Sequence, residues 1–551
     1  MAKELTYQPL TNLGINGLNT QDNPATLDNT WLTKADNVVL RENGRISFRK
    51  GLKQNVVPSG TAIGSLIEHN DQGTNKVFAS YGTSIYTVDF TTANAAFPTG
   101  DVDTMHTVSG SSGDWQFVNF NGRLNAFHED IVPQRYDGAL SDDSMWAAYD
   151  NSHRPSSVTS GEFKPSCGVG FYGRMWVGGV AEEKDVVHYS TLLDSDDFRT
   201  TAENGASNGG SIDLKTVWGT DEIVAIAPFF GKLVIFGKNN IAIYDSPDVI
   251  ASIALNEVIK GVGLVSRDSV QAIGDDLVFL SNTGLRSLAR TTEKDKLPLQ
   301  DLSLNIKDTL IRNIGNSTNV KSIYVENEGI YIMSFVDKNI NYVFDFKHRT
   351  PNNAPRVTTW SFDNDREPAS LTYTELYGLL VGQKDGSIAG YENYYDTDLA
   401  GASTYTDSSY TWSLETTWVN LGESIAASLL KRLFMVLEGG SGATMGIKWY
   451  KDFSGTPSTT TSIVLNPVTT GTTSLWGASS SLYGATTATH THDAAVHPSN
   501  STYAPIFGLK EYRTPLTGSA KNIKIAIDIE SNGYDASLQT LTLLHKQGKI
   551  R

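Results

Sequence analysis

Three histidines within eight residues form the most distinctive group of potential ligands in the chain. His490, His492 and His497 stand in the stretch THTHDAAVH. On a β-strand, side chains two residues apart share a face, so His490 and His492 would present their imidazoles together, as a zinc or iron site requires. An exposed polar loop is the competing interpretation, because the surrounding sequence is of low complexity. A transition metal at this cluster is favoured if several copies of the loop meet on a symmetry axis.

No other group of residues has the spacing of a catalytic site. Cys167 is the only cysteine; it cannot form an intrachain disulfide, and no base accompanies it in the sequence. Two acidic clusters could attract a cation: Asp194, Asp196 and Asp197, and Asp363 with Asp365. They lack the spacing of a calcium loop, so we interpret them as solvated turns. Because the chain also has no nucleophile elbow, phosphate-binding loop or dinucleotide-binding glycine pattern, we expect no enzyme, no catalytic residue and no cofactor apart from the metal considered above.

Length, composition and charge limit the classes of protein to which the chain can belong. A chain of 551 residues is too long for one ordinary core, and its 39% hydrophobic residues exclude global disorder. The start MAKELTYQPL lacks the features of a signal peptide, and no apolar stretch is long enough to span a membrane. Residues 1–400 hold 33 Lys and Arg against 50 Asp and Glu, whereas residues 401–551 hold 11 against 10. An acidic surface repels phosphate, so tight nucleic-acid binding is not expected.

A segment of the form strand, turn, strand recurs seven times in the first four hundred residues. The clearest copies are KVFASYGTSIYTVD, which starts at Lys76, and KLVIFGKNNIAIYD, which starts at Lys232. Looser copies begin at Arg123, Arg174, Asp276, Gly329 and Gly378. All-β units that start 44 to 58 residues apart are typical of a β-propeller, in which each unit is one four-stranded blade. We predict seven blades, with six as the alternative count; a run of hairpins in β-sandwiches is the competing fold.

The repeats also define the expected domains. Residues 1–60 are predicted to form an N-terminal arm with a hairpin at Asn43-Gly44, residues 61–395 the propeller, and residues 396–410 a polar linker. Strand patterns in residues 411–551 predict a β-sandwich or jelly-roll-like domain, from which the low-complexity segment 466–503 projects as a long inserted loop. Helical periodicity is confined to Ser303 to Asn313 and Glu423 to Lys431.

Three parts of the chain carry a family resemblance. The first is GLNTQDNPATLDNTWLTKADNVVLRENGRISFRKG, from Gly17; the second is VVHYSTLLDSDDFRTTAENGASNGGSIDL, followed by a strand pair that ends in KNNIAIYD. The third comprises SLETTWVNLGESIAASLLKRLFMVLEGG, EYRTPLTGSAKNIKIAIDIES and LQTLTLLHKQGKIR. Together, and in this order, they resemble the tail nozzle, hub or tail tubular proteins of short-tailed bacteriophages. No repeat carries the WD or kelch signature of cellular propellers.

The resemblance implies a structural virion protein. Such a chain would form a homo-hexameric ring or tube below the portal-adaptor complex of the tail, where it retains genomic DNA and then conducts it during ejection. It would also contact tail fibres, a needle or other tip proteins, and its subunits would assemble in the host cytoplasm. The acidic charge agrees with this role, because a lumen of the same sign as DNA lets DNA pass without specific binding.

Two other functions remain open on the residues alone. A propeller that binds or hydrolyses glycans would need carboxylates and arginines that converge on its mouth. Arg123, Arg174, Arg286 and Glu129 lie in or beside the repeats, although their positions are not equivalent from unit to unit. The other alternative is a soluble scaffold that binds partners through the propeller face. A particle of six copies would favour the nozzle, whereas a monomer with glycan affinity would favour the glycan-binding protein.

Overall fold

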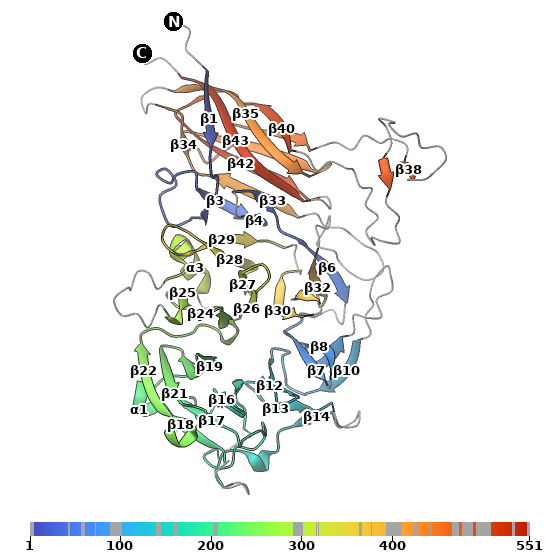
Figure 1. The fold of residues 1–551 in the computed structure, drawn as a ribbon, viewed down its shortest axis with the longest axis vertical. Helices are drawn as coiled ribbons and strands as arrows, with labels where there is room; N and C mark the ends of the chain where they lie inside the picture. The colour runs from blue at the N-terminus through green and yellow to red at the C-terminus, as the bar shows by residue number, and fades with distance from the viewer. Residues whose placement is uncertain are drawn as a thin grey trace.

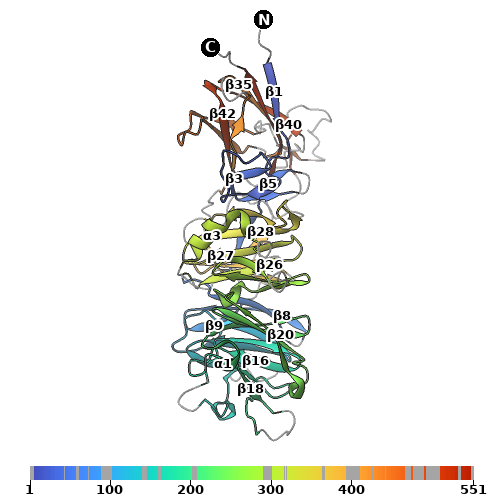
Figure 2. The ribbon, with the colours of Figure 1, turned by 90° about the vertical axis from the view of Figure 1, so that its left-hand side faces the viewer.

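The structure, a computed structural model, describes most of the chain. The described residues are 5–41, 44–56, 61–71, 73–88, 102–138, 145–158, 163–201, 208–289, 301–315, 317, 319–362, 366–375, 377–392, 410–422, 427–440, 442–465, 473–475, 489–491, 509–531 and 535–547. Within them the molecule is elongated and almost entirely β, with a propeller at one end and a sandwich at the other (Figure 1, Figure 2). None of the helices in these ranges is long and apolar enough to cross a membrane.

Seven strand units, numbered here in chain order, make up the propeller. Their strands are β7 (Ser65–Asp71), β8 (Thr74–Tyr81), β9 (Ser84–Val88) and β10 (Val102–Thr107) in unit 1; β11 (Gln116–Phe120), β12 (Arg123–His128), β13 (Ile131–Tyr136) and β14 (Trp146–Ala148) in unit 2; β15 (Cys167–Phe171), β16 (Arg174–Gly178), β17 (Val186–Tyr189) and β18 (Gly210–Asp213) in unit 3; β19 (Ile223–Phe229), β20 (Lys232–Gly237), β21 (Asn240–Asp245) and β22 (Ala254–Lys260) in unit 4; β23 (Gln271–Ile273), β24 (Asp276–Ser281) and β25 (Gly284–Ser287) in unit 5; β26 (Val320–Val325), β27 (Ile330–Phe335), β28 (Ile340–Arg349) and β29 (Pro355–Trp360) in unit 6; and β30 (Pro368–Thr374), β31 (Gly378–Gln383), β32 (Ile388–Glu392) and the N-terminal β6 (Gly51–Val56) in unit 7. The first strands of most neighbouring units contact one another, and units 4 and 5 share an apolar cluster, so the first strands surround the centre of the ring.

The propeller fold is confirmed. Six of its seven units are separate small sheets, so the number of separate blades agrees with six, the alternative count. Unit 6 differs because its outer strand β29 continues into the sandwich through β3 (Trp31–Asp36), with Thr359 opposite Asp36. The ring closes where unit 7 contacts unit 1, and β6 completes unit 7 by pairing with β32.

The ends of the sequence repeat are ion-paired across the second and third strands of a unit. Lys232 Nζ lies 3.0 Å from Asp245 Oδ1, and Arg123 Nε lies 2.8 Å from Asp137 Oδ2. Opposite charges that face each other across two strands each contribute about 0.2–1 kcal/mol. In these two repeats the basic residue at the start and the Asp at the end are thus explained by pairing within a blade, whereas Lys76 of unit 1 pairs with Asp71 at 2.7 Å.

Each blade is covered on both faces. On β20, Leu233 and Ile235 pack in one cluster with Trp176 of unit 3, whereas Val234 and Phe236 pack in another with Phe279 of unit 5. Successive side chains of a strand point to opposite faces, so an unbroken apolar run is buried only where both faces meet a neighbour.

The sandwich combines the two ends of the chain. Its strands are β1 (Leu5–Leu10), β2 (Gly17–Leu18), β3, β4 (Val38–Leu40), β5 (Ile46–Phe48), β33 (Thr411–Thr416), β34 (Val419–Asn420), β35 (Ser428–Gly439), β36 (Thr444–Lys451), β37 (Thr459–Val464), β40 (Leu509–Pro515), β41 (Ser519–Ala520), β42 (Asn522–Glu530) and β43 (Ala536–Lys546). β1 and β5 pair with β43, and β3 pairs with β33. The N-terminal segment therefore differs from the separate arm expected from sequence, because its apolar residues share a core with Trp412, Leu433 and Ile527.

Few helices interrupt these sheets. The eight-residue α3 (Lys307–Ile314) follows a short 3₁₀ turn, Leu304–Ile306, and buries Leu310 and Ile314, so the predicted helix near Ser303 to Asn313 is confirmed. Among the described residues, another α-helix is the four-residue α1 (Lys215–Trp218). Of the stretch Glu423 to Lys431, residues from Ser428 onward are strand β35, so the expected helix is wrong there.

Arg49 connects the sandwich with the propeller. Its side chain is fully buried, and its Nε donates to Asn37 Oδ1 at 2.8 Å while one terminal nitrogen donates to the Ser361 carbonyl at 3.2 Å. The guanidinium carbon lies 4.1 Å from the centre of the Tyr410 ring, and the Tyr410 hydroxyl donates to the Arg49 carbonyl at 2.7 Å. One side chain thus joins the N-terminal hairpin, the end of unit 6 and the start of β33.

Replacement of Arg49 should destabilise the whole molecule. In Arg49→Met the acceptors of Asn37 and Ser361 lose their donor in a buried site, so the free energy of unfolding should fall by about 3 kcal/mol, measured by urea denaturation. Arg45→Met is the control, because Arg45 forms its ion pair with Glu438 in a partly exposed position. This control should change stability by less than about 1 kcal/mol. Equal effects of the two substitutions would contradict the role given to Arg49.

Candidate functional site

The histidine cluster lies almost wholly outside the described residues. His490 belongs to the short strand β39 (Thr489–Thr491), which pairs in parallel with β38 (Thr473–Leu475). His492, His497 and most of the predicted loop 466–503 are not among the described positions. In the described part of the chain, no three His, Cys, Asp or Glu side chains are placed to hold a metal. The metal site therefore stays a prediction.

Cys167 and the acidic turn at Asp194 to Asp197, which the sequence analysis also considered, have structural roles. Cys167 is buried at the start of β15, and burial raises the pKa of its thiol to about 12, so the thiolate needed for nucleophilic attack is scarce at neutral pH. In the acidic turn, Arg199 lies 2.8 Å from Asp197, and Arg135 lies 3.5 Å from Asp196 and 3.9 Å from Asp194. Asp363 and Asp365 lie outside the described residues.

The residues considered for glycan binding do not converge. Arg123 pairs with Asp137 inside unit 2, and Arg174 donates to the Ser190 carbonyl at 2.5 Å inside unit 3. Arg286 donates to the Thr283 hydroxyl inside unit 5 at 2.9 Å. Glu129 is exposed at the turn between β12 and β13. Each side chain thus serves its own blade.

A different set of charged residues meets at the centre of the propeller. Lys321 Nζ lies 2.5 Å from Asp114 Oδ1 and 2.6 Å from Asp268 Oδ2. Arg267 Nε lies 3.0 Å from Asp268 Oδ1, and another nitrogen of Arg267 donates to the Ser166 carbonyl at 2.8 Å. Asp114 and Ser166 precede the first strands of units 2 and 3, whereas Arg267 precedes that of unit 5 and Lys321 lies in β26 of unit 6. Units 2 and 3 are not neighbours of units 5 and 6, so these contacts cross the axis of the ring.

We call Asp114, Arg267, Asp268 and Lys321 the channel network. Burial alone would raise the pKa of the Asp268 carboxyl, but Arg267 and Lys321 hold it well below its ordinary value. Burial alone would lower the pKa of Lys321, but Asp268 and Asp114 raise it. Asp268 and Lys321 are therefore charged at neutral pH, and the network pairs two basic side chains with two acidic ones. The network can hold opposite blades together, but its carboxylates and cations neutralise one another and supply no free acid or base.

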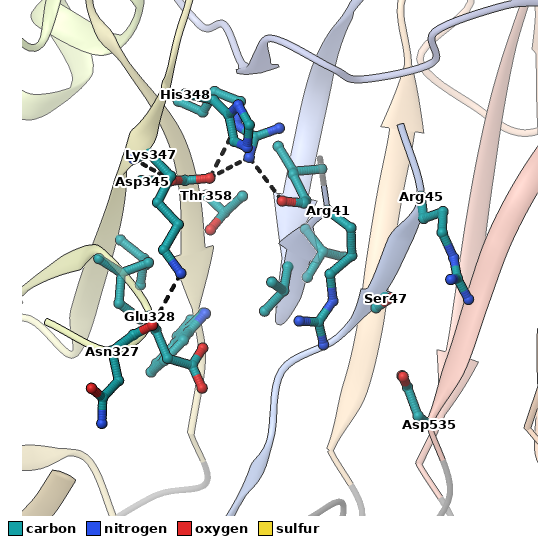
Figure 3. A pocket seen from close by; sticks show the side chains of 17 residues that line it. Arg41, Arg45, Ser47, Asn327, Glu328, Asp345, Lys347, His348, Thr358 and Asp535 are labelled. Atoms are coloured by element: carbon teal, nitrogen blue, oxygen red, sulfur yellow. Dashed lines mark hydrogen bonds and ion pairs between the residues drawn. The ribbon is translucent and has the colours of Figure 1, made fainter. Parts of the chain in front are cut away.

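A pocket of about 680 Å³ lies between the propeller and the sandwich (Figure 3). Asn327, Glu328, Asp345 and Lys347 line the wall formed by unit 6, and Arg41, Arg45 and Asp535 line the opposite wall. This wall comes from the β4–β5 hairpin and the segment before β43, so the pocket exists only because the N-terminal segment folds into the sandwich.

The charged groups of this pocket have partners within the protein. Arg356 donates through Nε to Asp345 Oδ2 at 3.1 Å and through a terminal nitrogen to the Leu40 carbonyl at 2.9 Å. Lys347 Nζ donates to the Asn327 carbonyl at 3.0 Å, and Lys50 pairs with Glu328 at 3.0 Å. A polar ligand could enter the pocket. However, because the charged side chains named above already have partners within the protein, the pocket is better described as a boundary between two domains than as a reaction centre.

Comparison with known proteins assigns no family to the chain. No family model and no curated protein matches the chain. Among solved structures, it is similar to the WD40 domain of Pan2 from Neurospora crassa, with 7% identity and a TM-score of 0.38 over 63% of this chain and 97% of that one. It is also similar to Raptor from Chaetomium thermophilum, with 15% identity and a TM-score of 0.37 over 63% of this chain and 29% of that one. At these values neither likeness bears on function, and the propeller assignment stands on the strand pairing.

Replacement of the Lys321 side chain tests whether the channel network stabilises the fold. Lys321→Met leaves the partly buried Asp268 carboxylate and the half-exposed Asp114 carboxylate with one arginine, so the free energy of unfolding at pH 7 should fall by about 2 kcal/mol. Lys184→Met is the matched control, because Lys184 pairs with Glu222 on the surface and its loss should cost less than about 1 kcal/mol. Denaturant titration of both variants measures the difference.

The effect of Lys321→Met should depend on pH in a defined direction. The pKa of Asp268 is lower in the folded protein than in the unfolded chain, so its stabilising contribution is present above the unfolded value of about 3.9 and declines as the pH falls below it. The stability difference between wild type and variant should therefore be larger at pH 7 than at pH 3. A difference that stays constant with pH would show that Lys321 acts through packing alone.

Metal analysis tests the histidine prediction. If His490, His492 and His497 bind a transition metal on a symmetry axis, purified assemblies should contain zinc, iron or nickel in a fixed ratio to the chain. The double variant His490→Ala, His492→Ala should then lose the metal, and wild type should release it near pH 5 to 6, because only neutral imidazole is a ligand. Absence of stoichiometric metal from wild-type assemblies would reduce the cluster to a polar loop.

Proposed function

We propose that this chain is a structural subunit of the tail nozzle or hub of a short-tailed bacteriophage, a hexameric ring or tube that retains genomic DNA and then conducts it during ejection. The observation that supports the proposal most strongly concerns two stretches that are distant in the sequence and that both resemble this family: they fold together. The stretch from Gly17 to Gly51 and the stretches from residue 413 onward pair with each other in one sandwich, through β3 with β33 and β5 with β43. A resemblance that coincides with one folded unit carries more weight than isolated motifs.

The chemistry of the propeller also favours a structural role. The channel network is neutral overall and braces opposite blades, and the buried Cys167 is not available as a nucleophile. Among the described residues, the arginines considered for glycan recognition are held within separate blades. A propeller of this kind is a rigid body that can present loops to other proteins.

Charge supports passage of DNA without attachment. Six copies would carry six times −16, or −96, and most of this charge lies in residues 1–400. An acidic lumen offers no array of Lys and Arg to replace the counterions of DNA, so DNA would not adhere. Cyclic symmetry would also make all subunit contacts equivalent and closed. In this role the chain would sit below the portal-adaptor complex and contact fibre, needle or tip proteins.

Particle mass is the first test of the proposal. We expect the isolated 59.9 kDa chain to be monomeric and to form a ring of six when it assembles on the tail, as measured by mass photometry of tails dissociated from particles. Particles that lack the chain should have incomplete tails and lose their DNA. If such particles kept both a complete tail and their DNA, the structural role would be wrong.

Binding of duplex DNA provides the second test. Fluorescence anisotropy with labelled duplex should detect no complex of the purified chain at physiological salt, because the charges of protein and DNA repel. A basic DNA-binding protein of similar size serves as the positive control. A complex with sub-micromolar affinity would contradict passive conduction.

A further inference from the structure

Three equivalent turns of the propeller share a backbone conformation but differ in sequence. They join the first and second strands of units 2, 3 and 4, and each contains two residues: Asn121-Gly122, Tyr172-Gly173 and Phe230-Gly231. The φ angles are 48° and 72° in the first turn, 45° and 70° in the second, and 45° and 75° in the third. Positive φ at both positions defines a type I′ turn, for which Asn-Gly is the preferred sequence.

Tyr172 and Phe230 are unfavourable choices for these turns. Left-handed backbone is tolerated by Asn, as at position 121, but it is strained for bulky side chains. Burial does not compensate, because Tyr172 is 47% exposed and Phe230 is 68% exposed. Strained residues of this kind persist mainly where they serve function. The two aromatic rings are therefore better explained by an external contact than by folding.

Two exposed leucines extend the aromatic turns into one surface. Leu192 is 49% exposed, and Leu193 is 57% exposed with a φ of 63°. A Cβ atom on Gly173 would lie 3.0 Å from Leu192 and 3.5 Å from Leu193, and a Cβ atom on Gly231 would lie 3.2 Å from the Tyr172 hydroxyl. The turns and the leucines are thus in contact. We call Tyr172, Leu192, Leu193 and Phe230 the aromatic-turn surface.

The exposed acidic group at the rim of this surface is Asp194. It directly follows Leu193, and its side chain is 46% exposed, whereas Asp196 is buried. Arg135 lies 3.9 Å from Asp194 and 3.5 Å from Asp196, so it is shared between the two carboxylates. Arg174, which follows the Tyr172-Gly173 turn, is buried, and the nearby Lys232 and Asp245 form an ion pair. The surface therefore combines an apolar centre with an exposed carboxylate at its edge.

The aromatic-turn surface and the channel network lie on opposite faces of the propeller. The first strand of each unit begins beside the network, at Asp114 in unit 2 and Ser166 in unit 3, and ends at the aromatic turn or its equivalent. The network lies toward one face, whereas the other face carries the partly exposed apolar side chains of the aromatic-turn surface.

We propose that the aromatic-turn surface is a docking site for another protein, one that presents apolar side chains flanked by Lys or Arg. Apolar contact would supply most of the binding energy, since exposed aromatic residues are frequent centres of protein interfaces. The basic flanks would meet the exposed Asp194 carboxylate, which would disfavour acidic partners, including the same surface of a second copy. This inference goes beyond the proposed function and does not depend on it, because it concerns the surface of the single chain.

The first experiment separates function from folding. The double variant Tyr172→Asn, Phe230→Asn reproduces the residues of the unit 2 turn, so its urea midpoint should equal or exceed that of wild type. Phe453→Asn is the matched control, because Phe453 is also exposed and has a φ of 66°, but lies in the sandwich against Trp418. A clear fall in the midpoint of the double variant would assign the aromatic residues to folding and overturn the proposal.

The second experiment measures docking with a defined probe, a short fluorescent peptide of alternating Leu and Lys. Wild type and Phe453→Asn should bind it with equal affinity, and the double variant, which has the same charge, should bind at least about tenfold more weakly. Asp194→Asn should also weaken binding, and a peptide of alternating Leu and Glu should bind poorly. Equal binding of the Leu-Lys peptide by wild type and double variant would refute the site.

Sedimentation velocity addresses the competing occupant. If the surface docks another protein, wild type and double variant should have the same sedimentation coefficient at high concentration. Self-association of wild type that the double variant loses would assign the surface to a second copy of the chain and overturn the choice of partner. The proposed function can fail independently, because neither assay requires a virion or a ring.

Discussion

The burial of the Arg49 guanidinium is the constraint on which the arrangement of the molecule depends. A charge removed from water is tolerated only where hydrogen bonds and aromatic faces surround it. Its partners come from three distant places, Asn37, Ser361 and Tyr410, so the site is complete only when the N-terminal hairpin, unit 6 and β33 are all in position. The pocket between the domains and the continuous sheet through β29 and β3 depend on the same junction.

Local patterns in the sequence were sufficient to predict the propeller, because each hairpin pairs strands only a few residues apart. The same patterns could not reveal pairing between distant strands. The partners of β6 and β1 are β32 and β43, which lie more than three hundred residues away. Tertiary pairing also overrides local propensity, as at Ser428, where a predicted helix is the beginning of β35 along β43. The blade count was ambiguous for a physical reason, since unit 6 belongs to the ring and to the larger sheet at once.

The site was less predictable than the fold. Asp114 and Lys321 are 207 positions apart, and no motif links them. One signal was present: a lysine in the first strand of a blade, β26, needs a carboxylate partner, because an unpaired buried charge there would be costly. The type I′ turns give a second signal, since an aromatic residue before Gly in a two-residue hairpin departs from the usual Asn-Gly. The histidine spacing suggested metal chemistry, but spacing alone does not place side chains in space.

The shared N-terminal segment has a mechanical consequence. β6 is the closing strand of the propeller, whereas β5, two residues earlier, is bonded to β43 in the sandwich. A force that pulls the two domains apart would be transmitted through this short connection to both sheets. The force would act on β6 parallel to its partner β32, so several hydrogen bonds would resist together rather than break one by one. Separation of the two domains would therefore require both sheets to yield at the same time.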